Sequence, residues 1–251
     1  MFLKKINCPR PVIITDSQEE IDKASEEGIA VIGYEHDGIR LRTDFIITSP
    51  DALYDDYIKE VHDLYYRIPR VILETGRTVI KQMDPENDVL KLFDLYDKPG
   101  VTEFMEPLYP YLEEKAYEQD YFDNIYRFYD FGMWNVFLKS DGRLIGRCGL
   151  EYKVLPVIKS EKTVDEAVLH SDDNWLELGY VTDPDLWHQG YGLETTRAVL
   201  ELARSKGHHQ FFAQIAPLNK ASAALAQKLG FNEAGEIPDA GENLWILKEE
   251  A

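Results

Sequence analysis

Two glycines, Gly190 and Gly192, stand directly before a predicted helix, in the turn that begins at Trp187. Apolar residues recur at helical spacing from Leu193 until the pattern ends at Gly207. A turn with glycines at the start of a helix leaves several backbone N–H groups without partners beside the positive end of the helix dipole. This arrangement favours binding of a phosphate group, although a plain tight turn could contain the same glycines.

Strands and a second helix are predicted on either side of this turn. Leu176–Val181 alternates as a strand does, and Pro184 ends it because proline cannot donate to a sheet ladder. Phe211–Ile215 is a short apolar run that predicts the next strand. Asn219 can cap a helix after it, and Gly230 ends that helix.

The types and spacing of these residues carry a family resemblance. The matching residues are Trp187-x-x-Gly190-Tyr191-Gly192-x-Glu194 and Asn219-x-x-Ser222-x(5)-Lys228-Leu229-Gly230-Phe231. They resemble the two acetyl-CoA motifs of the GNAT N-acetyltransferase superfamily, most closely its branch of ribosomal-protein N-terminal alanine acetyltransferases. The resemblance covers roughly Ile72 to Lys248 and implies an α/β acyl-CoA N-acyltransferase fold, with a mixed central sheet flanked by helices. Many family members have Gln or Arg where this chain has Trp187.

The resemblance also implies how the co-substrate acetyl-CoA is held. The turn would bind its phosphates, and backbone amides near Tyr180 and Val181 would hold the pantetheine arm and the thioester carbonyl. Asn219 caps a helix whether or not it also contacts the cofactor. The expected cofactor-binding residues are Tyr180, Val181, Trp187, His188, Gln189, Gly190, Tyr191, Gly192 and Asn219.

Acetyl transfer to an amine requires a group that removes the proton of the acceptor ammonium. Glu177 is the first candidate, because it lies on the predicted strand before the turn and the family's active-site cleft opens beside that strand. Glu151, at the end of the neighbouring predicted strand, is the second candidate. Either glutamate could instead be a surface residue on a half-exposed strand.

The departing thiolate needs a proton donor. Related transferases often have a tyrosine five residues before the position of Phe231, where this chain has Ala226. We expect Ser222 to replace it, because a hydroxyl can donate to sulfur or hold a water that does; alternatively, Ser222 only satisfies the first helical turn. Cys148 carries no sign of activation and is expected to be a buried thiol, so transfer should be direct.

The acceptor is expected to be a cationic amine. Residues 84–130 contain 13 acidic and 4 basic residues, with seven of the chain's fifteen tyrosines. In the resembling family this helical region forms one wall of the acceptor site, and carboxylates and aromatic rings suit an ammonium group. The alternative is a solvated helix surface whose tyrosines pack inward. A protein N-terminus and a small-molecule amine both remain open as acceptors.

The N-terminal part, residues 1–66, is predicted to be a separate Rossmann-like extension, followed by the transferase domain in residues 67–251. Pro11–Ser17, Gln18–Glu27 and Ile29–Tyr34 give a strand, a helix and a strand at the spacing of a parallel unit. The segment resembles part of a haloacid-dehalogenase-type Rossmannoid domain, in which an acidic loop, here with Asp16 and Glu20, binds magnesium. Too little chain precedes Asp16 to hold that family's nucleophile, so we expect a structural or regulatory remnant rather than a phosphatase.

The remaining segments give a regular pattern of elements. A third N-terminal strand is expected at Asp44–Thr48, and a bridging helix at Pro50–Tyr66. The transferase part should then contain two short strands around Gly76 in Val71–Met83, helices at Asp88–Tyr96 and Leu112–Tyr129, a hairpin of Met133–Leu138 and Leu144–Leu150 turning at Asp141-Gly142, and a long loop at Tyr152–Asn174.

Composition narrows the class of protein. The formal net charge of −19 over 251 residues argues against a nucleic-acid partner, which needs clustered Lys and Arg. Two cysteines give no disulfide framework, and no apolar run approaches a membrane span or a signal peptide, so we expect a cytoplasmic protein with no membrane partner. His208-His209 lack spaced partners, so no metal is assigned. A homodimer is left open, as is a non-catalytic acetyl-CoA-binding sensor or scaffold.

Overall fold

The computed structural model describes residues 9–129, 131–156, 158, 175–238 and 240–248. The chain divides into two compact units, residues 1–70 and 71–251, which are described separately. Most of the segment predicted as a long loop, Tyr152–Asn174, lies outside the described residues.

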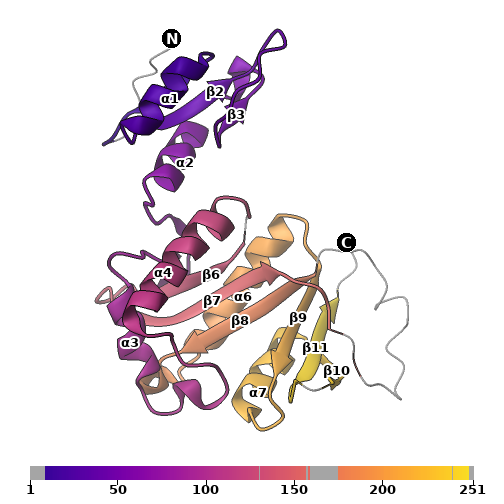
Figure 1. Cartoon of the computed structure of the whole chain (residues 1–251). Coiled ribbons are helices and arrows are strands. Elements are labelled where there is room, and N and C mark those ends of the chain that lie inside the picture. The colour runs from indigo at the N-terminus through magenta and orange to yellow at the C-terminus, as the bar shows by residue number, and fades with distance from the viewer. Residues whose placement is uncertain (1–8, 130, 157, 159–174, 239, 249–251) are drawn as a thin grey trace. The chain divides into compact units, whose positions relative to one another are not determined.

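The first unit is a three-stranded parallel sheet with a helix on each face (Figure 1). Neighbouring residues of a strand face opposite sides of a sheet, so Val31 packs with the first helix and Ile32 with the second. The parallel strand–helix–strand prediction is confirmed. The second helix packs within this unit through Ile58 and Val61. The elements are β1 (Val12–Thr15), α1 (Gln18–Glu26), β2 (Ala30–Tyr34), β3 (Ile46–Ile47) and α2 (Asp55–Tyr65).

The acidic loop of the first unit has partners within the unit. Asp16 Oδ2 lies 3.0 Å from Nε2 of His36, whereas Glu20 accepts a hydrogen bond of 2.5 Å from the Thr15 hydroxyl. In the part of the chain that the structure describes, no group of three or more His, Cys, Asp or Glu side chains is placed to hold a metal ion.

A chain that begins at Val71 is expected to fold by itself. The two hydrophobic clusters of the first unit contain only residues before Arg70, and the main cluster of the second unit begins at Ile72, so truncation removes whole cores. Circular dichroism should show a cooperative thermal transition for residues 71–251. As a control, a chain that begins at Met83 also loses β4 (Val71–Glu74) and β5 (Thr78–Lys81) and should aggregate. An insoluble chain from Val71 would show instead that the two units fold as one.

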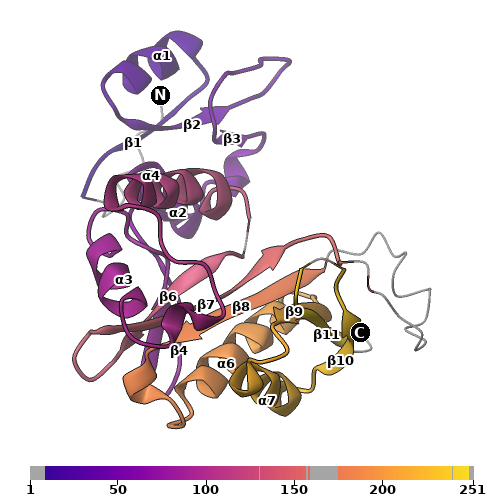
Figure 2. The ribbon, with the colours of Figure 1, turned by 60° about the horizontal axis from the view of Figure 1, so that its bottom comes forward.

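The described residues of the second unit form an eight-stranded mixed sheet in the order β10-β11-β9-β8-β7-β6-β5-β4. Helices α3 and α4 lie on one side of it, and α6 and α7 lie on the other (Figure 2). The strands after β5 are β6 (Met133–Leu138), β7 (Leu144–Tyr152), β8 (Leu176–Thr182), β9 (Gln210–Ile215), β10 (Asn232–Glu236) and β11 (Asn243–Lys248). The helices are α3 (Val89–Tyr96), α4 (Tyr111–Tyr121), α6 (Tyr191–Ser205) and α7 (Lys220–Leu229).

Most of these elements match the predictions from sequence. The hairpin at Asp141-Gly142 is confirmed as the antiparallel pair of β6 and β7, and Gly142 has the positive φ of 71° that its turn requires. The predicted helix Leu112–Tyr129 is shorter, because α4 passes into a π-helical turn at Phe122–Tyr126. Two strands, β10 and β11, follow Phe231 and were not predicted. Within the described residues, no helix has both the length and the hydrophobicity to cross a bilayer.

Candidate active site

The predicted turn lies at the N-terminus of α6, a 15-residue helix on the face opposite α3 and α4. Gly190 is the N-cap with φ 83°, and His188 just before it also has a positive φ, 61°. Trp187 and Gln189 brace the turn, since Nε1 of Trp187 donates to the Thr182 carbonyl (2.8 Å) and Nε2 of Gln189 to the Asp185 carbonyl (3.0 Å). The first N–H groups of α6 thus open onto a preformed turn at the positive end of its dipole, which suits a phosphate.

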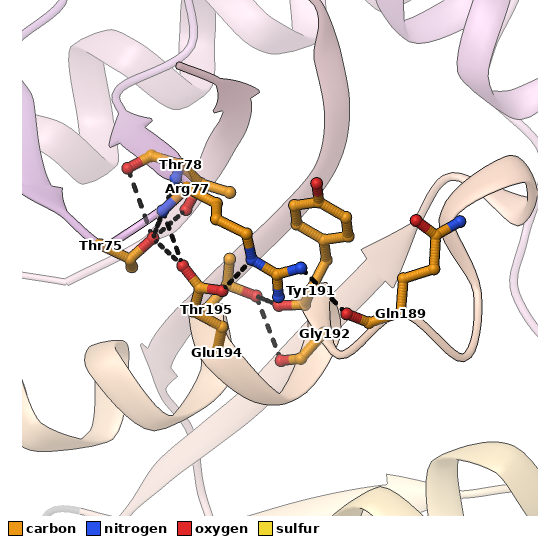
Figure 3. Close-up of polar contacts among 8 residues, drawn as sticks. All are labelled: Thr75, Arg77, Thr78, Gln189, Tyr191, Gly192, Glu194 and Thr195. Atoms are coloured by element: carbon orange, nitrogen blue, oxygen red, sulfur yellow. Dashed lines mark hydrogen bonds and ion pairs between the residues drawn. The ribbon is translucent and has the colours of Figure 1, made fainter. Parts of the chain in front are cut away.

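Arg77, in the turn between β4 and β5, fastens this helix start (Figure 3). Its Nε donates to Oε2 of Glu194 (2.6 Å), and its NH1 group donates to the Gln189 carbonyl (3.0 Å). The guanidinium carbon lies 3.8 Å from the centroid of the Tyr191 ring, within the range of a cation–π contact. No Lys or Arg occurs between Trp187 and Gly192, so Arg77 brings positive charge to a turn that has none of its own.

Glu194 is ionised in this arrangement. Partial burial alone would raise the pKa of its carboxyl group, but hydrogen bonds from Thr75 and Arg77 outweigh burial and lower that pKa. The hydroxyl of Thr75 donates to Oε1 at 2.6 Å, and the backbone N–H of Arg77 donates to the same oxygen at 2.9 Å. The positive charge of Arg77 therefore lies beside both the Glu194 carboxylate and the start of α6.

Replacing Arg77 by methionine should weaken binding of acetyl-CoA about tenfold, because the change removes positive charge beside the turn and leaves the Glu194 carboxylate uncompensated there. Calorimetric titration with coenzyme A measures the effect directly. The affinity of Arg77→Lys should lie between those of the wild type and Arg77→Met, since lysine keeps the charge but lacks the forked donors. Unchanged affinity in a folded Arg77→Met protein would exclude Arg77 from the phosphate site.

The strand before the turn is only partly paired. β8 pairs with β7 along its whole length, from Leu176 to Thr182, but with β9 only at Leu176 and Glu177. Figure 1 shows the two strands diverging from there. From Leu178 onward, the β9-facing backbone groups of β8 have no sheet partner among the described strands. This open edge, which includes Tyr180 and Val181, suits an extended amide-containing chain such as pantetheine.

A cavity of about 640 Å³ opens beside the point where the two strands diverge. It lies over the C-terminal part of β7 and the start of β8, between the loop that follows α3 and the turn between β10 and β11. Four of its lining residues are glutamates and one is a lysine. The lining residues are Phe104, Met105, Glu106, Met133, Glu151, Lys153, Glu177, Gly179 and Glu242.

The two glutamates predicted from sequence face each other in this cavity. Glu151 and Glu177 are directly opposite partners on β7 and β8, an arrangement that is unfavourable for like charges unless a cation intervenes. Lys153 supplies it, with Nζ 2.8 Å from Oε2 of Glu177 and 3.2 Å from Oε2 of Glu151. The other oxygens accept from neutral donors: Oε1 of Glu177 from the Gln214 amide (2.7 Å), and Oε1 of Glu151 from the Tyr121 hydroxyl (2.5 Å).

The remaining charges make the cavity negative. Burial raises the pKa of Glu242, and the nearby carboxylate of Glu177 raises it further. Burial would lower the pKa of Lys153, but its hydrogen bond to Glu177 and the charges of Glu177 and Glu151 outweigh it, so the pKa is raised. Glu106 and Glu242 have no ion-pair partner among the described residues. One ammonium therefore faces four carboxyl groups.

Only part of the acidic region 84–130 contributes to this cavity. Glu106 and its neighbours Phe104 and Met105 line it. Glu118 instead points into the core from α4, fully buried, and pairs with Arg147 of β7 at 2.9 Å. Glu114, also buried, accepts the backbone N–H of Tyr109 at 2.9 Å. Glu118 thus ties α4 to the sheet, whereas Glu114 fixes the loop just before α4. Neither carboxylate lines the cavity, so the acidic composition of the region exceeds the charge that an acceptor would meet there.

Ser222 lies at the start of α7 and is not among the residues that line the cavity. Its backbone N–H donates to Oδ1 of Asn219 (3.0 Å), so Asn219 caps α7, and its carbonyl accepts from the Tyr180 hydroxyl (3.2 Å). Burial raises the pKa of Tyr180 to about 12, which keeps its proton in place. Cys148 is buried, and burial raises the pKa of its thiol to about 12. Such a thiol is a poor nucleophile.

Sequence reasoning missed Lys153, Gln214, Glu242 and Arg77. Lys153 follows Glu151 by two residues, so the alternation of a strand places both side chains on one face, and this signal could have been read. Nothing local marks the other three. Gln214 reaches Glu177 across 37 positions of sequence and Arg77 reaches Glu194 across 117, which depends on the sheet order.

The chain is similar to several known acetyltransferases. An acetyltransferase of L-methionine sulfoximine and L-methionine sulfone from Pseudomonas paraeruginosa is 38% identical over 69 residues, which cover 27% of this chain and only 40% of that relative. A ribosomal-protein-serine acetyltransferase structure from Vibrio cholerae has a TM-score of 0.55 at 18% identity, covering 72% of this chain and 98% of that one.

RimL, a ribosomal alpha-N-protein acetyltransferase in complex with coenzyme A, has a TM-score of 0.54 at 17% identity and covers 71% of this chain and 98% of that one. At these identities the two structures establish the fold alone. The family model described as acetyltransferase (GNAT) domain matches residues 77–232, more than half of the chain. The protein therefore belongs to the GNAT acetyltransferases, enzymes that use acetyl-CoA.

Proposed function

We propose that this enzyme transfers an acetyl group from acetyl-CoA directly to a primary amine that arrives as a cation. The observation that carries the proposal is the negative cavity beside the open edge of β8, where a carboxylate pair, Glu151 and Glu177, faces the space that an acceptor would fill. Carboxylates attract an ammonium group and can also accept its proton. A non-catalytic sensor could use such a pair only to bind an ammonium, so turnover distinguishes the two.

The co-substrate would bind along the open edge of β8 and at the start of α6. Acetyl-CoA supplies an activated thioester. The N-terminal amides of α6 and the guanidinium of Arg77 would hold its phosphates, and the unpaired backbone of β8 near Tyr180 and Val181 would hold the pantetheine arm. Trp187, His188 and Gln189 would act by shaping the turn, since the side chains of Trp187 and Gln189 donate to backbone carbonyls just before it.

Glu177 would remove the proton of the acceptor. It is the last residue of β8 that pairs with β9, so its carboxylate stands at the point where the open edge begins. Glu151, directly opposite, is the second candidate. The neutral amine would then attack the thioester carbonyl, and the buried thiol of Cys148 would take no part.

The thiolate would receive its proton near the start of α7. Ser222 remains our candidate, directly or through a water. The Tyr180 hydroxyl, which donates to the Ser222 carbonyl, is a second protonated group at the same place, and it comes from the neighbouring strand rather than from the helix. Tyr180 is therefore a second candidate for the role of the family's tyrosine, whose position is Ala226 here.

The acceptor would be a small molecule or a protein N-terminus, and the named relatives include both kinds. The likeness to ribosomal-protein alanine acetyltransferases favours an N-terminus. An assay of thiol release from acetyl-CoA with a panel of amino acids, diamines, aminoglycosides and short peptides tests the proposal. Cationic primary amines should be turned over, and absence of turnover with all of them would contradict it.

We further propose that the first unit is a haloacid-dehalogenase-like remnant with a structural or regulatory role. The side chains of Asp16 and Glu20 have separate partners, His36 and Thr15, rather than a common one. Such an arrangement favours packing over phosphatase chemistry.

A further inference from the structure

The ion pairs of Lys153 define a position for one cation on the cavity wall. Both Oε2 atoms of the facing pair, Glu151 and Glu177, point at its Nζ, at 3.2 Å and 2.8 Å. Both Oε1 atoms are occupied by neutral donors, Tyr121 and Gln214. The two oxygens that the neutral donors leave available therefore converge on one position, which the ammonium group of Lys153 occupies.

The present occupant is easy to displace. The Lys153 side chain is half exposed, with 50% of its surface accessible, and it hangs on a flexible four-carbon stem. The carboxylates are far less exposed, at 26% for Glu151 and 16% for Glu177. The cation position is thus fixed by the strands, whereas the cation that fills it can swing toward solvent.

Resting on the proposed function, we propose that the ammonium of Lys153 occupies the binding position of the acceptor ammonium and leaves it when the acceptor binds. The acceptor's nitrogen then lies within hydrogen-bond distance of Glu177 Oε2, the oxygen that takes its proton. Until then, Lys153 keeps two opposed carboxylates compensated. Its own proton is held firmly, since its pKa is raised, so it serves as a positioning and specificity-determining residue and not as the base.

This exchange makes the enzyme selective for charge. An acceptor that brings an ammonium can take the place of Lys153. A neutral amine does not displace Lys153, because doing so would leave two facing carboxylates without a cation, and the cost of that imbalance keeps neutral acceptors such as aromatic amines out of this position. Glu106 and Glu242 also line the cavity and attract a cation, but they do not form a facing pair that fixes its position.

The test is steady-state kinetics of Lys153→Met at saturating acetyl-CoA. The KM of a cationic alkylamine should fall about tenfold because its competitor is gone, with kcat within about twofold of wild type. The KM of a neutral aromatic amine should not change. Lys153→Arg should keep the wild-type KM, because a cation still occupies the position.

The matched control is Lys139→Met, which removes the same charge from an ion pair with Glu74 (2.8 Å) outside the cavity. It should leave KM unchanged. An unchanged KM for cationic amines in Lys153→Met, or a fall in kcat at constant KM, would overturn the proposal. If Lys153→Met proves unstable, Lys153→Gln carries the same expectations.

Failure of this inference is distinguishable from failure of the proposed function. Calorimetric titration of an alkylamine onto the protein with coenzyme A present measures acceptor binding without turnover. Lys153→Met should bind the amine about tenfold more tightly than wild type. Tighter binding with no acetylation by any variant would uphold the exchange and contradict the function, whereas acetylation with equal binding would do the reverse.

Discussion

Replacement of Glu177 by glutamine is expected to lower kcat about a hundredfold at neutral pH, the usual scale for loss of a general base. Glutamine keeps the shape and can still accept a hydrogen bond from Gln214, but it cannot take the proton of an ammonium. Affinity for coenzyme A should barely change, since the side chain faces the acceptor cavity. Rates of thiol release across a pH range provide the measurement.

The pH profile separates loss of the base from a general disturbance. As pH rises toward the pKa of the acceptor, more amine is already neutral in solution, so the deficit of Glu177→Gln should shrink. A matched control is Glu74→Gln, which removes a lysine-paired carboxylate on β4 and should leave the rate unchanged. Wild-type rates for Glu177→Gln at every pH would transfer the role to Glu151, and the same measurement on Glu151→Gln would test that assignment.

Replacement of Gly190 by valine is expected to weaken binding of acetyl-CoA about a hundredfold. A β-branched residue at φ 83° is strained, so the turn changes shape and its amides no longer meet the phosphate. Loss of two charge-assisted hydrogen bonds, at about 1.5 kcal/mol each, accounts for an effect of that size. Titration calorimetry with coenzyme A measures it.

A second glycine of α6 controls for strain alone. Gly207 follows the other end of the helix with φ 88°, and a Cβ there would meet nothing within 4 Å. Gly207→Val imposes a comparable backbone penalty far from the turn, so it should lower the melting temperature in the manner of Gly190→Val while leaving cofactor affinity intact. Equal affinities of the two variants for coenzyme A would show that the turn does not bind the cofactor.

The parts of the fold that were predictable have local causes. A helix between Gly190 and Gly207 and a hairpin at Asp141-Gly142 follow from residues that are neighbours in sequence. β10 could not be found in this way, because Asn232–Glu236 lies at the edge of the sheet and has no apolar run. β10 is a strand because its backbone pairs with β11, and its own sequence does not indicate this.

Less of the candidate site than of the fold could be predicted from sequence. Helix α4 was predicted from its sequence, but its face was not, because Glu114 and Glu118 point inward and Leu112 is 77% exposed. A rule that places charged residues on the surface therefore assigns the wrong face of this helix to the core. Glu177 and Glu151 were identified as separate candidates, whereas their opposition across β7 and β8 is a property of strand register. The role of Lys153 depends on that register.

The divergence of β8 from β9 bears on how such enzymes can change over time. A ligand held by main-chain groups at a strand edge makes few demands on the side chains there, provided that the strands keep their course. Proteins can therefore share this architecture at the 17–18% identity seen with the solved structures. Diversification of acceptors would instead be recorded in the cavity wall, where one exchange at Lys153 or Glu242 alters the charge that an incoming amine encounters.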